Sequence, residues 1–124
     1  MRIASYLEAH EKVTWVNYPG LASNKYYPMA QKYLTGCSGV ISFGVLGGKQ
    51  KAMEVMNNLK LAAIVVHVAD ARTSILHPAS TTHRQLTDEQ LDAAGILPEL
   101  LRFSVGIDDV EDIIADLEQA LARI

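Results

Sequence analysis

Hydrophobic and polar positions follow two different periods along residues 100–121, LLRFSVGIDDVEDIIADLEQAL. Over residues 100–107 the period is two, and one face collects the apolar side chains Leu101, Phe103, Val105 and Ile107, which predicts a β-strand. After Asp108, a candidate N-cap with Glu111 three residues on, apolar residues recur at helical spacing, namely Val110, Ile113, Ile114, Leu117 and Leu121. The stretch therefore predicts a strand followed directly by a helix that covers its apolar face.

The same two periods divide the rest of the chain into alternating elements. Short runs rich in β-branched or aromatic residues predict strands at residues 13–18, 39–45, 61–68 and 73–76. Helical spacing predicts helices at residues 1–11, from a cap at Ser23 or Asn24 to residue 34, at 50–59, and from a Thr87–Gln90 capping box to Gly95. The run at 61–68 is the most apolar, and we expect it to be the central strand.

This alternation predicts a two-layer α/β sandwich of the α+β type. Helices pack on one face of its sheet, and the other face stays open and partly polar. The length of 124 residues suits a single domain, divided into a helix at residues 1–11 and a sheet-and-helix core at residues 12–124. The pattern of the first helix already runs at Arg2 without a capping residue, which favours a chain cut from a longer protein.

Composition argues against several classes of partner. The formal net charge is −3 without a basic run, which disfavours nucleic-acid binding. No stretch approaches the ~20 apolar residues of a membrane span. Cys37 is the single cysteine, so an internal disulfide cannot form, as suits a cytoplasmic protein.

Two polar residues in the predicted strands are candidates for chemistry. Arg102 lies on the face opposite the apolar residues of its strand, among the small residues Ser104 and Gly106. A guanidinium is permanently charged and rarely buried without a partner, so Arg102 either stands in water or grips a carboxylate with two parallel hydrogen bonds. His67 lies at the end of the apolar run, where a core histidine bonded by backbone is the usual interpretation.

Four segments, in this order and spacing, resemble one known family: YPGL at residues 18–21, SGVISFGVLGG at 38–48, HPASTTH at 77–83 and the stretch at 100–121. They are similar to the C-terminal domain of the Cys/Met-metabolism pyridoxal-phosphate enzymes, the transsulfuration group. Within the group, the resemblance is strongest to the O-acetylhomoserine sulfhydrylases, with methionine γ-lyases and cystathionine synthases and lyases as neighbours. It implies the C-terminal small domain of a fold-type-I transferase, with helices on one face of a mostly antiparallel sheet.

The resemblance also implies roles for particular residues. Arg102, in the RxSVG motif, would bind the α-carboxylate of an amino-acid substrate such as O-acetylhomoserine. A second contact on the carboxylate side falls on His67, where the family usually has Ser or Asn, and Ala69 stands where it often has glycine. The family's pyridoxal 5'-phosphate is held by a lysine after a Ser-x-Thr pattern in a larger N-terminal domain, and none of the six lysines here has that pattern. The chain would thus supply no catalytic and no cofactor-binding residue, and would act with that domain in a homotetramer.

Two functions of different classes follow from the sequence. The first is a domain of an enzyme that replaces the acetate of O-acetylhomoserine with sulfide or a thiol, or of a γ-lyase or cystathionine enzyme of the same family. The second is a free-standing α/β module that binds a carboxylate ligand or regulates a partner. The uncapped first helix and the missing cofactor lysine favour the first.

Overall fold

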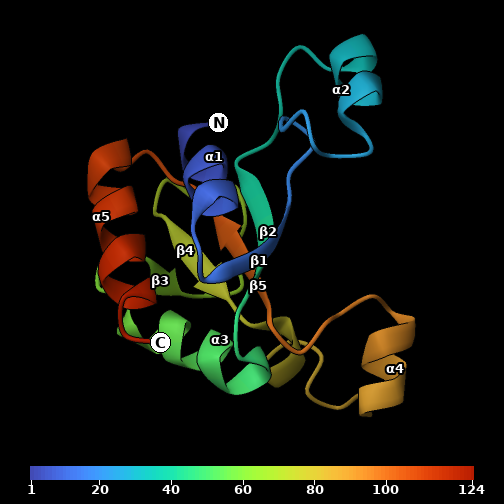
Figure 1. Ribbon diagram of the computed structural model, residues 1–124, viewed down its shortest axis with the longest axis vertical. Helices are drawn as coiled ribbons and strands as arrows, with labels where there is room; N and C mark the ends of the chain where they lie inside the picture. The colour runs from blue at the N-terminus through green and yellow to red at the C-terminus, as the bar shows by residue number, and fades with distance from the viewer.

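The computed structural model describes all residues, 1–124, and shows a five-stranded sheet with helices against it (Figure 1). The strands are β1 (Val13–Asn17), β2 (Val40–Val45), β3 (Ala63–Ile64), β4 (Ser74–Leu76) and β5 (Leu100–Ser104). The helices are α1 (Arg2–Ala9), α2 (Tyr27–Tyr33), α3 (Gly48–Asn58), α4 (Asp88–Ala93) and α5 (Val110–Leu121), with a 3₁₀ turn at Pro78–Ser80. None of the helices combines the length and the apolar character that crossing a lipid bilayer requires.

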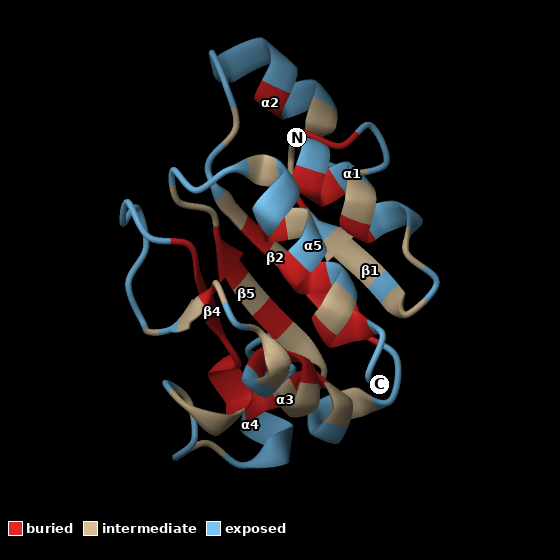
Figure 2. Ribbon diagram, turned by 90° about the vertical axis from the view of Figure 1, so that its left-hand side faces the viewer, coloured by how far each residue is buried: buried red, intermediate tan, exposed pale blue.

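The middle of the sheet is formed by β5, the strand predicted by the alternation at residues 100–107. The strand order is β1-β2-β5-β4-β3, and Figure 2 shows β5 between β2 and β4. β5 pairs antiparallel with both neighbours, and β1 pairs antiparallel with β2. Only the short β3 runs parallel to its neighbour β4. The mostly antiparallel sheet that the resemblance implies is therefore confirmed.

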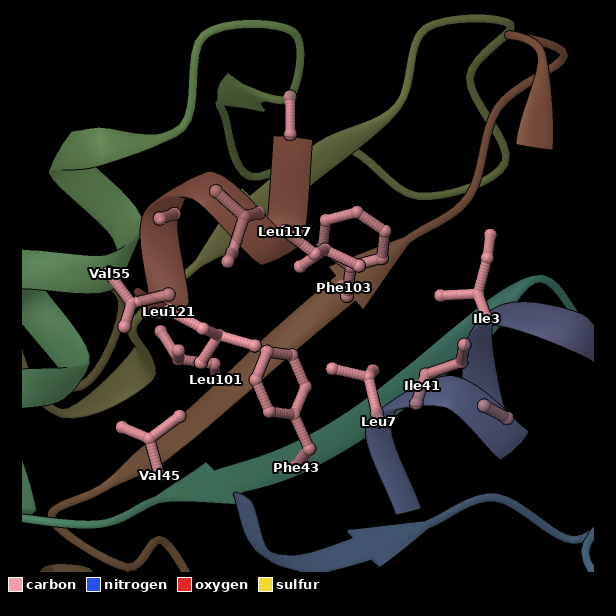
Figure 3. Close-up of a cluster of buried hydrophobic side chains, with 14 of the residues drawn as sticks. Ile3, Leu7, Ile41, Phe43, Val45, Val55, Leu101, Phe103, Leu117 and Leu121 are labelled. Carbon is pink, nitrogen blue, oxygen red and sulfur yellow. The ribbon is translucent and has the colours of Figure 1, made fainter. Parts of the chain in front are cut away.

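One face of the sheet is covered by helices, and the hydrophobic core lies between these two layers. Period-2 alternation turns Leu101 and Phe103 of β5 to the same side, where both are buried. The helical spacing of α5 brings Leu117 and Leu121 to the opposing surface, and Figure 3 shows these side chains together in one cluster. Residues of α1 and α3 complete the cluster, among them Leu7 and Val55. The two-layer sandwich is confirmed.

The opposite face is more covered than the prediction implies. The indole of Trp15 lies against Gly44, where an added Cβ would come within 2.2 Å of the indole nitrogen. Ser74 and Ser104, paired across β4 and β5, are buried. The part that stays accessible is a smaller region, which we call the open patch, formed by the partly exposed residues Ser42, Leu100 and Arg102.

The apolar run at residues 61–68 does not form the central strand, so that prediction is wrong. Only Ala63–Ile64 form a strand, and it lies at the edge of the sheet. The buried carboxylate of Asp116 on α5 accepts the backbone N–H groups of residues 60–62 at 2.8–3.1 Å. This contact fixes the start of the run beside α5, at the side of the sheet. Apolar composition alone does not distinguish a central strand from such an edge segment.

The start of α5 also differs from the prediction. Its N-cap is Asp109, whose Oδ1 accepts the N–H of Glu111 at 2.8 Å. Asp108, the predicted cap, instead accepts the N–H of Thr73 at 2.9 Å. The strand before it ends at Ser104, and Ile107 is exposed. A long-range partner therefore decides which of two adjacent aspartates caps the helix.

The remaining caps were predicted with mixed success. The capping box of Thr87 and Gln90 at the start of α4 is confirmed. The N-cap of α2 is Tyr26 rather than Ser23 or Asn24. The reason is that the Oδ1 of Asn24 accepts the N–H of Tyr26 in the turn before the helix.

Candidate functional site

Arg102 stands at the centre of the sheet, on the face away from the helices. Its register partners are Ser42 on β2 and Leu76 on β4. Because Leu101 and Phe103 on either side of it point into the core, strand alternation turns Arg102 toward the open patch. The sequence pattern predicted this placement, and the structure confirms it.

The guanidinium of Arg102 is hydrogen-bonded at one nitrogen and unpaired at the others. Nη2 donates to the carbonyl oxygen of Val66 at 2.7 Å and to that of His67 at 3.4 Å. The Nε–H is buried without a hydrogen-bond partner, and the ion pairs of the chain all involve other residues. A guanidinium has five N–H donors, so donors remain for an acceptor from outside the chain. A carboxylate, with two oxygens that match the planar fork, is the acceptor this geometry suits.

Both carbonyls belong to an irregular segment, residues 65–73, which is tied to the turn between β5 and α5. The N–H of Thr73 donates to Oδ2 of Asp108 at 2.9 Å, and its Oγ1 accepts the N–H of Gly106 at 3.0 Å. Hydrogen bonds from Thr73 hold the pKa of the Asp108 carboxyl below its usual value. Thr73 itself is completely buried. These contacts fix the end of the segment in the structure beside β5.

His67 lies in this segment and is not the buried histidine that its place in the sequence suggests. Because β3 ends at Ile64, residues 65–68 leave the sheet, and the His67 side chain is 68% exposed with Nδ1 3.6 Å from Oδ2 of Asp70. Ala69, two residues on, has a φ of 58°, in the left-handed region that glycine adopts without steric cost. The structure brings His67 to Arg102 through its carbonyl rather than through its ring.

The buried histidine is His77, which the apolar pattern does not single out. Its Nδ1 accepts from the hydroxyl of Ser80 and its Nε2–H donates to the carbonyl of Pro98, both at 2.7 Å. Burial lowers the pKa of His77, a trend that the Pro98 carbonyl opposes and the nearby Lys49 strengthens. Both ring nitrogens are in use, so His77 joins the end of β4 to the segment before β5. The available signal in the sequence is a histidine directly before proline at the end of an apolar strand.

Four of the six lysines contact residues away from the open patch. Lys12 donates to the carbonyls of Leu121 and Ala122, and Lys51 pairs with Glu54. Lys25 and Lys32 lie over the rings of Tyr26 and Tyr33. None of the open-patch residues Ser42, Leu100 and Arg102 has an amino group, so they fit the anionic group of a substrate and do not fit the Schiff-base linkage of pyridoxal phosphate.

Comparison with known proteins agrees with the motif segments. The model of the family "Cys/Met metabolism PLP-dependent enzyme" matches residues 1–122. The homocysteine synthase of Schizosaccharomyces pombe is 50% identical over 120 residues, which are 96% of this chain and 28% of that protein. The O-acetyl-L-homoserine sulfhydrylase of Leptospira meyeri is 41% identical over 126 residues, 100% of this chain and 28% of that protein. An L-methionine gamma-lyase of Fusobacterium nucleatum subsp. nucleatum is 45% identical over 122 residues, 98% of this chain and 31% of that protein.

The fold has a close counterpart among solved structures. A crystal structure of an O-acetylhomoserine (thiol)-lyase from Campylobacter jejuni, with N'-pyridoxyl-lysine-5'-monophosphate, superimposes with a TM-score of 0.90 at 37% sequence identity. The match covers 98% of this chain and 29% of that one. The chain thus spans less than a third of the length of these relatives.

Proposed function

The chain belongs to the family of Cys/Met metabolism PLP-dependent enzymes, and we propose that it is the C-terminal domain that binds the substrate carboxylate in such an enzyme. The state of Arg102 carries this proposal. Its charge is partly buried, no carboxylate of the chain pairs with it, and the N–H groups of its Nη1 have no partner. An anionic group from outside the chain would satisfy this cation. The α-carboxylate of an amino acid has the required charge and shape.

The reaction we propose is the replacement of the acetate of O-acetylhomoserine by sulfide or a thiol. Relatives named homocysteine synthase and O-acetyl-L-homoserine sulfhydrylase, 50% and 41% identical, support it. Pyridoxal phosphate, the cofactor of the family, supplies the electron sink when bound. This chain contributes orientation, because two parallel hydrogen bonds to the carboxylate fix the direction in which the α-carbon of the substrate is presented. We expect the chain alone to be inactive.

A methionine γ-lyase is the second candidate, and the 45% identity to such an enzyme supports it. Both reactions begin with an α-amino acid, so Arg102 would have the same role in both. Product analysis separates the two. A sulfhydrylase forms homocysteine from O-acetylhomoserine and sulfide, whereas a γ-lyase releases methanethiol from methionine.

We propose a larger cofactor-binding domain as the direct partner of the open patch, within a homotetramer. The length of the relatives supports such a domain. The residues Ile64, Val66 and Val68, which are 48%, 56% and 51% exposed, offer it an apolar surface around the carbonyl that contacts Arg102. The exposed ring of His67 is proposed as a second contact beside the substrate carboxylate, since its own carbonyl already lies against the guanidinium.

The substitution Arg102→Ala in the assembled enzyme tests the role of the arginine. Removing one partner of a largely desolvated charge pair costs about 2–5 kcal/mol, so kcat/KM for O-acetylhomoserine should fall by roughly two orders of magnitude or more. Arg102→Lys keeps the charge without the planar fork and should not restore full activity. The matched control is Arg84→Ala, which removes an exposed arginine. Cofactor absorption should be normal in all three variants.

Two inhibitors isolate the carboxylate itself. L-homoserine and 3-amino-1-propanol differ only in that group, and we call the ratio of their inhibition constants the carboxylate preference. Arg102→Ala should abolish this preference, and Arg84→Ala should leave it unchanged. If Arg102→Ala kept the preference, Arg102 would not be the carboxylate-binding residue.

A further inference from the structure

We infer that Asp108 is a positioning residue for Arg102. Through Thr73, it holds the carbonyls of Val66 and His67 against the guanidinium, and so it sets the direction in which Arg102 presents its remaining N–H groups. This inference rests on the proposed carboxylate-binding function of Arg102.

The first step concerns what orients Arg102. Its only hydrogen bonds run from Nη2 to the carbonyls of Val66 and His67, at 2.7 and 3.4 Å. An arginine side chain has large rotamer freedom, and strand alternation fixes only the face from which it starts. The position of these two carbonyls therefore decides where the rest of the fork points.

The second step concerns what holds those carbonyls. The side chains of Val66, His67 and Val68 are exposed, so packing gives this part of the segment little support. Apart from the bonds of Arg102 itself, one hydrogen bond reaches it from the sheet, from Oγ of Ser74 to the carbonyl of His67, at the long distance of 3.5 Å. The near end of the segment is held by β3, which pairs with β4 up to Ile64, and the remaining support comes from the far end.

The third step is the contact between that end and the turn after β5. The carbonyl of Ala71 accepts the N–H of Ile107 at 2.8 Å. A Cβ added to Gly106 would lie 2.2 Å from the same carbonyl oxygen, so the two backbones are in direct contact. Asp108 adds the one side-chain hydrogen bond from this turn to the N–H of Thr73. Because Thr73 is completely buried, loss of that acceptor would leave a buried donor unpaired.

Nuclear magnetic resonance of the ¹⁵N-labelled 124-residue chain tests the anchoring directly. The buried Arg102 Nε–H should exchange slowly with solvent, and Asp108→Ala should accelerate the exchange by roughly tenfold, the effect of one lost hydrogen bond. Asp108→Asn keeps an oxygen acceptor and should restore slow exchange. Asp109→Ala is the matched control, because it removes the neighbouring aspartate, which caps α5 and does not touch Thr73.

A second pair of variants, at Thr73, tests the same anchoring if Asp108→Ala does not fold. Thr73→Val keeps the shape of the side chain and removes the oxygen that accepts the N–H of Gly106, whereas Thr73→Ser keeps that oxygen. We expect accelerated exchange of the Arg102 Nε–H in the first and slow exchange in the second. Slow exchange in both Asp108→Ala and Thr73→Val would overturn the inference.

The carboxylate preference of the assembled enzyme separates this inference from the proposed function. Asp108→Ala should lower the preference by roughly tenfold and leave inhibition by 3-amino-1-propanol unchanged. In an Arg102→Ala background, Asp108→Ala should have no further effect on the preference. If Arg102→Ala abolishes the preference and Asp108→Ala leaves it intact, or weakens both inhibitors equally, the inference is wrong and the proposed function stands. If Arg102→Ala retains the preference, the proposed function fails first.

Discussion

Phe103 and Arg102 are adjacent in β5, but they face opposite sides of the sheet and have opposite surroundings. Phe103 lies in the core under α5, and the chain itself supplies every neighbour it needs. Arg102 lies at the open patch with two carbonyl contacts and unpaired donors. Polar groups follow the same division, since the Asp116 carboxylate on the helix side accepts three backbone N–H groups from within the chain.

The difference shows how one strand separates residues of the core from a residue proposed for binding. Successive side chains of a strand point to opposite faces, so the positions that specify the fold alternate along β5 with Arg102, the position that we propose for binding. A substitution on one face can therefore leave the function of the other intact. Measurements on each face separately can break or sharpen this comparison.

The largest expected effect separates these two neighbours by stability. Phe103→Ala should lower the free energy of unfolding by about 3–5 kcal/mol, as a large-to-small change in a packed core. Arg102→Ala should lower it by about 1 kcal/mol or less, since it removes one good hydrogen bond to Val66. Urea denaturation followed by circular dichroism measures both. Equal losses in the two variants would contradict the division between the faces.

An intermediate effect is expected for the polar anchor on the helix side. Asp116→Ala leaves the N–H groups of residues 60–62 without their acceptor, which should cost about 2–3 kcal/mol of unfolding free energy. Asp116→Asn retains one oxygen acceptor and should cost less. Asp112→Ala, on the exposed side of the same helix, is the control in the same urea titration. A loss at position 112 as large as that at 116 would show that the anchor is not specific.

The smallest effect is a dependence of stability on pH that His77 should cause. Burial lowers the pKa of His77 in the folded chain. At pH values between that lowered pKa and about 6.5, the unfolded chain therefore has a protonated His77 and the folded chain a neutral one. The contribution of His77 to stability is therefore complete above about pH 6.5 and is lost as the pH falls, with a slope of at most about 1.4 kcal/mol per pH unit. Unfolding free energies between pH 8 and pH 5 measure it. His77→Gln should flatten the slope, and His67→Gln, a change at an exposed side chain, should not.

The sequence is sufficient to predict the structure where burial alone determines which residues point inward. Phe103 and Leu117 follow regular periods because the core selects apolar residues at each inward position, and Arg102 breaks that pattern visibly. The sequence is insufficient where a hydrogen bond to a distant backbone group determines the role of a side chain. Nothing local to Asp108 indicates that it binds the N–H of Thr73 instead of capping α5.

Two histidines at the ends of apolar runs show the same limit. His67 lies at the end of the run at residues 61–68 and His77 directly follows residues 73–76, but the first is exposed and the second is buried. The partner of His77 is the carbonyl of Pro98, twenty-one residues away. The contact of His67 with Arg102 also uses a carbonyl. Every residue has a carbonyl, so no pattern of side chains can reveal such a contact.

The central place of β5 has a consequence for the order of events during protein synthesis. β1 and β2 form one half of the sheet, β3 and β4 form the other, and only β5 pairs with both. A nascent chain therefore carries two unjoined halves until Ser104 has left the ribosome, and closure then depends on contacts distant in sequence, which form slowly. Arg102 arrives in the same strand that closes the sheet. A carboxylate ligand would thus recognise only chains whose sheet is closed, and its binding would report that step of folding.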